Sequence, residues 1–173
     1  MLNILTAPHP ILKKIAEPVD TVTKTERQFL DDMLETMYHA NGIGLAAPQV
    51  GISRRMLVMD IGDRTIEDGE DEDGSKVLQL INPQIIAQSQ ETSEYQEGCL
   101  SFPQAYETIM RPSEVTVRYL DRDGAERELK AKGLLAVCVQ HEIDHLNGVT
   151  FVDHLSRLKR EMILRKMRKL KSN

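Results

Sequence analysis

The feature that most constrains this chain is a histidine-glutamate-x-x-histidine stretch, which runs from His141 to His145 at the end of an apolar run. Gly133 precedes the run and Gly148 follows it, so the segment has the length of a helix. Side chains four residues apart share one helix face, with Cβ atoms about 5–6 Å apart, so both histidines can bind one metal ion. Glu142 lies off the helix face that the two histidines share, and it is better placed to handle the protons of a metal-bound water. The stretch therefore predicts a metal site.

The composition fits one soluble domain. The chain has 173 residues, enough for a sizeable core, and its 40% hydrophobic and 28% charged residues are ordinary for a globular protein. The formal net charge of −5 argues against DNA binding. The sequence has no apolar run of membrane-spanning length and no N-terminal export signal. We expect a single catalytic domain over residues 1–173, monomeric and cytoplasmic, with no DNA or membrane partner.

Two histidines leave a metal ion short of ligands, and two residues are candidates for the third. Cys99 has a glycine before it and Pro103 after it, a setting that exposes a thiol. A thiolate with two imidazoles keeps a fourth position open for water, as catalytic sites do. Glu161 is the alternative, although nothing else marks it.

A disulfide between Cys99 and Cys138 is not expected without an export signal. Sulfur and nitrogen ligands suit zinc, and imidazole also suits iron(II).

Hydrophobic periodicity predicts the elements before the metal helix. A helix begins near Thr25, with Thr23 and Glu26, or Thr25 and Gln28, as a capping box, and it ends at Gly42. Strands are expected over residues 56–61, 77–82 (ended by a proline), 85–94, 113–121 and 125–131. An Asp-Gly dipeptide joins the last two strands, which indicates a hairpin.

Three further segments complete the expected fold. Residues 2–19 are interrupted by prolines and favour turns, with a short helix near residues 11–16. The acidic segment 62–76 is expected to be a solvated loop between strands. Residues 156–170 form a basic amphipathic helix with Ser156 as its N-cap, and the charged side is ordinarily a solvated face, with binding as the alternative. We expect an α+β fold with mixed or antiparallel β-sheets packed around a central metal-binding helix, plus an N-terminal and a C-terminal helix.

Three segments together carry a more specific pattern. They are Gly42-Ile43-Gly44-Leu45-Ala46-Ala47-Pro48-Gln49, Glu97-Gly98-Cys99-Leu100-Ser101 and Gln140-His141-Glu142-Ile143-Asp144-His145. In order and spacing they resemble the three motifs of bacterial peptide deformylases, and the similarity extends over nearly the whole chain. The resemblance implies a metalloenzyme that removes the formyl group from the N-terminal formylmethionine of nascent polypeptides. It also implies one divalent metal ion, Fe²⁺, with Zn²⁺, Ni²⁺ or Co²⁺ as substitutes.

The resemblance assigns the metal ligands and the proton carrier. Cys99, His141 and His145 are then the ligands, and Glu142 is the general acid/base. A metal-bound water or hydroxide attacks the formyl carbonyl, because the ion lowers the pKa of water toward neutrality. Glu142 takes the proton of the water and later passes one to the departing amine.

The other two motifs supply the groups around the reacting carbonyl. The Gln49 side chain and the backbone N–H of Leu100 are the implied oxyanion donors, and losing one such donor typically costs about 10²–10³ in rate. Glu97 and Arg111 are implied to form a buried ion pair that holds the Cys99 turn.

The methionine side chain of the substrate needs an apolar slot beside the metal. Leu134, Val137 and Cys138 precede His141 by seven, four and three residues, so they share its helix face. With Ile43, Gly44 and Glu97 they are the predicted substrate-binding residues. Core packing is the alternative explanation for the three helical residues.

Two other functions remain open at this point. One is a short zinc endopeptidase, which would use the same activation of water. The other is a non-catalytic, ribosome-associated metal-binding module in which the basic C-terminal helix is the binding element. The expected partners are formylmethionyl nascent peptides and, through that helix, the ribosome.

Overall fold

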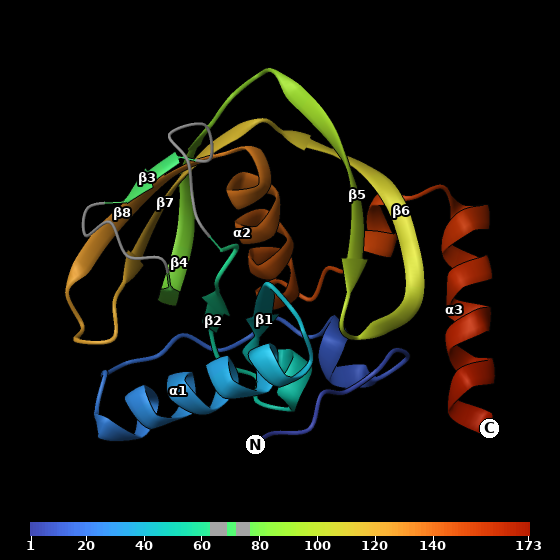
Figure 1. The fold of residues 1–173 in the computed structure, drawn as a ribbon, viewed down its shortest axis with the longest axis horizontal. Coiled ribbons are helices and arrows are strands. Elements are labelled where there is room, and N and C mark those ends of the chain that lie inside the picture. Colours follow the sequence, from blue (N-terminus) through green and yellow to red (C-terminus); the bar gives the residue numbers. More distant parts are fainter. Residues whose placement is uncertain (63–68, 72–76) are drawn as a thin grey trace.

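The structure is a computed structural model that describes residues 1–62, 69–71 and 77–173. Within this part of the chain, two antiparallel sheets enclose a central helix, α2 (Gly133–Leu146), as Figure 1 shows. The larger sheet has six strands, in the order β1-β2-β4-β7-β8-β3. The smaller sheet is a long hairpin of β5 and β6 on the other side of α2. The α+β prediction with a central helix is confirmed.

The strands of the larger sheet pair only with antiparallel neighbours in the described residues. Their bounds are β1 Gly44–Ala46, β2 Met56–Met59, β3 Gly69–Asp71, β4 Leu78–Gln88, β7 Glu114–Leu120 and β8 Glu126–Lys132. The turn between β7 and β8 has Gly124 at φ +80°, a left-handed conformation that a hairpin turn favours. The predicted hairpin is therefore confirmed.

Strand β2 is buried on both faces and joins two cores. Side chains alternate across a strand, so Leu57 and Met59 pack toward α2, together with residues of β4, β7 and β8. Met56 and Val58 pack on the opposite face against helix α1 (Lys24–His39). This double burial is the reason that the sequence of β2 is continuously apolar.

The hairpin of β5 (Thr92–Cys99) and β6 (Phe102–Pro112) carries a third core. There the 3-10 helix Phe151–His154 and helix α3 (Arg157–Ser172) pack on it. In Figure 1, α3 lies outermost, beyond β6. Met167 is the residue of α3 that is fully buried, so the helix touches the body of the protein along a narrow stripe.

The predicted helices agree closely with the structure. Thr23 is the N-cap of α1, and its hydroxyl accepts from the backbone N–H of Thr25 and donates to the Glu26 carboxylate. These are the residues of the first proposed capping box, but they meet through a side chain–side chain bond and not through the reciprocal backbone bonds of that motif. Ser156 caps α3, which runs on to Ser172. The short N-terminal helix is a 3-10 turn, Pro10–Lys13, placed slightly earlier than expected. In the described part of the chain, no helix is long and apolar enough to cross a membrane.

Four strand predictions were wrong. The strand expected over residues 85–94 is interrupted, because β4 ends at Gln88 and β5, in the other sheet, begins at Thr92. Strand β4 continues through Pro83, because the register shifts there and the Asn82 side chain bonds both backbone groups of Val19. Strand β6 was not predicted at all, since its alternation is broken by charged residues whose partners lie far away in sequence. Within segment 62–76, residues Gly69–Asp71 form β3 at the sheet edge and not a loop. The rest of that prediction, at residues 63–68 and 72–76, lies outside the described residues.

Candidate active site

Three potential ligands from distant parts of the chain meet at one point. In the described residues, the ligand atoms of Cys99, His141 and His145 all lie within 4.8 Å of one another. Cys99 ends strand β5, and the two histidines lie one turn apart on α2. The Cys99 sulfur is 3.3 Å from Nε2 of His145. The structure brings the predicted set together, whereas Glu161 lies on the surface of α3 in an ion pair with Arg157.

The orientation of His141 is set by a carboxylate behind it. Nδ1 of His141 lies 2.9 Å from Oε1 of Glu97. Burial by itself would raise the pKa of Glu97, but hydrogen bonds from His141 and Arg111 outweigh it and lower the pKa to about 2. The carboxylate is therefore ionised and can only accept, so Nδ1 of His141 carries the hydrogen. This leaves Nε2 with a free lone pair for a metal ion.

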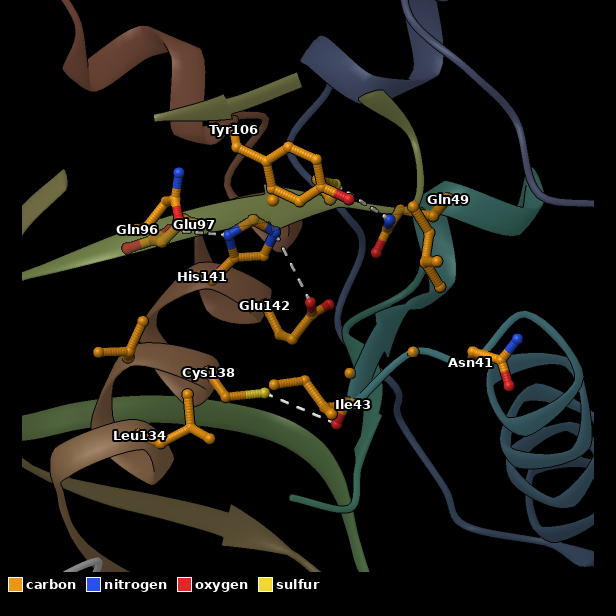
Figure 2. Close-up of a pocket in the computed structure, with 16 residues that line it drawn as sticks. Asn41, Ile43, Gln49, Gln96, Glu97, Tyr106, Leu134, Cys138, His141 and Glu142 are labelled. Atoms are coloured by element: carbon orange, nitrogen blue, oxygen red, sulfur yellow. Dashed lines mark hydrogen bonds and ion pairs between the residues drawn. The ribbon is translucent and has the colours of Figure 1, made fainter. Parts of the chain in front are cut away.

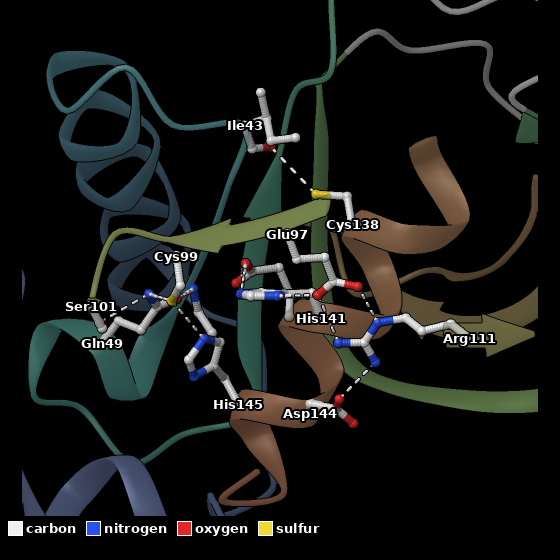
Figure 3. A network of polar contacts seen from close by, with 12 residues as sticks. Ile43, Gln49, Glu97, Cys99, Ser101, Arg111, Cys138, His141, Asp144 and His145 are labelled. Atoms are coloured by element: carbon white, nitrogen blue, oxygen red, sulfur yellow. Dashed lines mark hydrogen bonds and ion pairs between the residues drawn. The ribbon is translucent and has the colours of Figure 1, made fainter. Parts of the chain in front are cut away.

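Arg111 holds this carboxylate in place (Figure 3). Its Nε and Nη2 donate to the two oxygens of Glu97 at 2.7 and 3.0 Å, and its Nη1 donates to Asp144 at 2.8 Å. Both side chains of the Glu97–Arg111 pair are about 5% exposed. A bidentate pair of this kind fixes orientation as well as charge. The ion pair implied by the resemblance is present, and Asp144 is a third member that the sequence did not reveal.

The site also contains buried polar atoms that the protein does not satisfy. In the described residues, Oε2 of Glu142 and Nδ1 of His145 are buried without a hydrogen-bond partner. Burial lowers the pKa of His145, helped by His141 and Arg111, so that imidazole favours the neutral form that binds metals. A neutral imidazole, an oriented imidazole and a thiol within reach of one point form a donor set that fits a transition metal ion.

A pocket of about 300 Å³ opens in front of these residues (Figure 2). It is lined by all six predicted substrate-binding residues, Ile43, Gly44, Glu97, Leu134, Val137 and Cys138, as well as by Gln49, Leu100 and Glu142. Asn41, Gly42, Gln96, Gly98 and Tyr106 also line it and were not predicted. Tyr106 could not be found from sequence, because its ring reaches the pocket across Gly98 of the partner strand.

Gly44 brings strand β1 against the metal helix. A Cβ atom at this position would lie 2.9 Å from the Cys138 sulfur and 3.0 Å from Cγ of Glu142. Any side chain would therefore push the strand away from α2 and widen the pocket. Burial raises the pKa of the Cys138 thiol, so this second cysteine stays neutral and forms part of the apolar wall.

The Gln49 amide is fixed with its nitrogen toward the metal ligands. It lies in the 3-10 helix Ala47–Val50, and its Oε1 accepts from the backbone N–H of Ala46 at 2.9 Å. Its Nε2 therefore points the other way, to Ser101 Oγ at 3.1 Å and to the Cys99 sulfur at 3.5 Å. Burial raises the pKa of the nearby Glu142 carboxyl to about 7. A fixed N–H donor and an unsatisfied carboxylate thus lie beside the ligand cluster.

The sequence matches the family model for polypeptide deformylase over residues 1–161. The chain belongs to the polypeptide deformylase family. It is 50% identical over 171 residues to the peptide deformylase of Pelagibacter ubique, covering 99% of this chain and 95% of that protein. It is 48% identical to that of Rhizobium meliloti over 166 residues, covering 96% and 91%.

A solved structure of the same family gives the same fold. The peptide deformylase from Ehrlichia chaffeensis in complex with actinonin is 43% identical, with a TM-score of 0.93, and the match covers 100% of this chain and 99% of that one. Membership makes this chain a metal-dependent hydrolase with deformylase activity. It also decides against the endopeptidase and the non-catalytic module as alternatives.

Proposed function

We propose that this member of the polypeptide deformylase family removes formyl from the N-terminal formylmethionine of nascent polypeptides with one divalent metal ion held by Cys99, His141 and His145. The observation that carries the proposal is the convergence of these three side chains beside the buried carboxylate of Glu142. Fe²⁺ is the proposed ion, with Zn²⁺, Ni²⁺ or Co²⁺ as substitutes. When bound, it supplies a Lewis acid that lowers the pKa of a water molecule toward neutrality.

The residues of the chain handle the proton and the developing charge. Oε2 of Glu142 is buried and without a partner, so it is free to accept the proton of the attacking water. The oxygen of that water adds to the formyl carbon. The carbonyl oxygen then gains negative charge, and we assign its stabilisation to Nε2 of Gln49 and the backbone N–H of Leu100. When the C–N bond breaks, Glu142 returns its proton to the amine, and formate leaves.

We assign the pocket to the methionine side chain. Leu134, Val137 and Cys138 on α2 give it apolar surface, together with Ile43 beside Cys138. Gly44 leaves the strand close enough for backbone contact with a peptide. Glu97 contributes to the wall, but its oxygens already serve Arg111 and His141, so we propose that it orients the ligand and does not bind substrate.

The decisive experiment is an anaerobic assay of the iron-loaded protein on formyl-Met-Ala, with acetyl-Met-Ala as the control. We expect formate release from the first peptide only, because the larger acetyl group must fit where the formyl hydrogen lies. Cleavage of an internal bond in an unformylated peptide, without formate release, would replace the proposal with an endopeptidase.

Finer assignments go with this function. We propose that residues 1–173 act as one monomeric catalytic domain in the cytoplasm, where nascent chains are made. We further propose that the basic face of α3 meets the ribosome. Arg157, Lys159 and Arg165 are among its exposed cations, and Leu158 and Met162 are exposed on the same helix. The test is co-sedimentation of the full chain with ribosomes, which we expect to weaken as salt is raised and to be lost when the charges on α3 are removed.

A further inference from the structure

His154 lies outside the three sequence motifs but contacts the network behind the metal ligands. It ends the 3-10 helix Phe151–His154, and its Nε2 is 2.8 Å from Oδ2 of Asp144. The same oxygen accepts a hydrogen bond from Nη1 of Arg111, also at 2.8 Å. A carboxylate oxygen only accepts, so both partners are donors.

The contacts continue inward without a break. Arg111 holds both oxygens of Glu97, and Oε1 of Glu97 accepts from Nδ1 of His141. Donors and acceptors alternate along the whole line, from His154 at the surface to His141 at the site. The side chains become less exposed in the same direction, from 37% for His154 and 23% for Asp144 to 4% for Glu97.

A second contact joins the same 3-10 helix to the same ligand. The ring of Phe151 stacks on the ring of His141, with centroids 6.1 Å apart and planes at 25°. Phe151 also packs edge-on against Phe102 of β6. The helix that carries His154 is therefore held at a fixed distance from His141, independently of the polar line.

We propose that His154 is a positioning residue for the metal centre. It anchors the partly exposed Asp144 carboxylate, which holds Arg111, and Arg111 in turn holds Glu97 and the ring of His141. Without the imidazole, Asp144 is free to turn toward water, and Arg111 keeps only its contacts to Glu97. This inference rests on the proposed function, because it requires His141 to be a ligand.

The experiment compares three variants of the zinc-loaded full chain by the rate at which zinc passes to an excess of chelator. His154→Ala removes the donor, and His154→Gln keeps an N–H at similar reach. Lys13→Ala is the matched control, because it breaks the ion pair to Asp153 on the same 3-10 helix and does not touch Asp144. We expect release about fivefold faster for His154→Ala, below the 10–100-fold typical of a partner in direct contact with a ligand. His154→Gln and Lys13→Ala should release zinc at the wild-type rate.

Each other outcome overturns the inference. If His154→Ala releases zinc at the wild-type rate, the hydrogen bonds from His154 to His141 do not affect the metal centre. Equal acceleration in the Ala and Gln variants, or in Lys13→Ala, means that docking of the 3-10 helix matters and the hydrogen bond does not. Failure of the wild-type chain to hold zinc would instead remove the ligand assignment, and the proposed function with it.

Discussion

Helices α2 and α3 both stand out in the sequence, but the protein uses them in opposite ways. Almost every side chain of α2 is buried, and His141 and His145 meet Cys99 at a common centre. On α3 only Met167 is fully buried, and the charged side chains face outward. The difference shows that a few polar residues create chemistry when they are buried with partners, whereas many charges on a surface create at most a docking face.

The largest expected effect tests whether the third metal ligand comes from β5 or from α3. Cys99→Ala should lose most of the bound metal and all measurable turnover, because two imidazoles alone leave the ion under-ligated. Metal content after purification and dialysis measures this. Glu161→Ala is the control and should keep full metal. Unchanged stoichiometry in Cys99→Ala would contradict the ligand set and bring α3 into the site.

The next effect separates metal binding from catalysis within α2. Glu142→Ala should keep its metal but lose about 10²–10⁴-fold in kcat, the usual contribution of a positioned general acid/base. The measurement is formate release from formyl-Met-Ala, normalised to bound metal. Turnover near the wild-type value would contradict the assignment of Glu142 as the general acid/base.

A third prediction concerns how firmly α3 is attached. Met167→Ala should lower the free energy of unfolding by about 2 kcal/mol, at the low end for a buried methionine, because the outermost helix can settle into the space. Urea unfolding measures the change. Met162→Ala, at a position 60% exposed, should change stability by less than about 0.5 kcal/mol. Loss of metal in Met167→Ala would show that the two helices are more tightly coupled than their contacts indicate.

The smallest effect lies at the 3-10 helix between α2 and α3. Burial by itself would raise the pKa of Asp153, but hydrogen bonds from Lys13 and from Thr150 outweigh it and lower the pKa below 3.8. The stabilisation is therefore present above about pH 4 and is lost as the pH falls through the lowered value. Asp153→Asn should cost about 1 kcal/mol or less at pH 7, and unfolding curves of the two proteins should converge below that pH. A constant difference down to pH 2 would contradict the assignment.

Sequence alone predicted the elements whose signals are local. The periodicity of α1 and α2, the Asp-Gly hairpin and the caps at Thr23 and Ser156 all depend on neighbours within a few residues. The candidate ligands and pocket lining could also be named, because three motifs with known spacing carried the resemblance. The structure brings these residues to one place.

What sequence could not provide depends on pairings that form only in the folded chain. Nothing near Arg111 or Asp144 indicates that one will hold the other, or that His154 will reach the same carboxylate. Strand β6 was missed because Arg111 places a charge at a buried position, where its partners are Glu97 and Asp144 from distant parts of the chain. Pro83 misled the strand assignment because its missing N–H falls at a register shift, which only the pairing with β7 defines.

Because β2 is buried on both faces, it links the unfolding of the two layers that pack on it. Met56 and Val58 pack in the core with α1, and Leu57 and Met59 pack in the core with α2, so these four consecutive residues belong to both cores. A slip of this strand by one residue would exchange the two sets and disrupt both halves together. The ligand-bearing helix therefore cannot loosen on this side while the N-terminal half stays intact, and we expect unfolding of these two layers to be a single cooperative event.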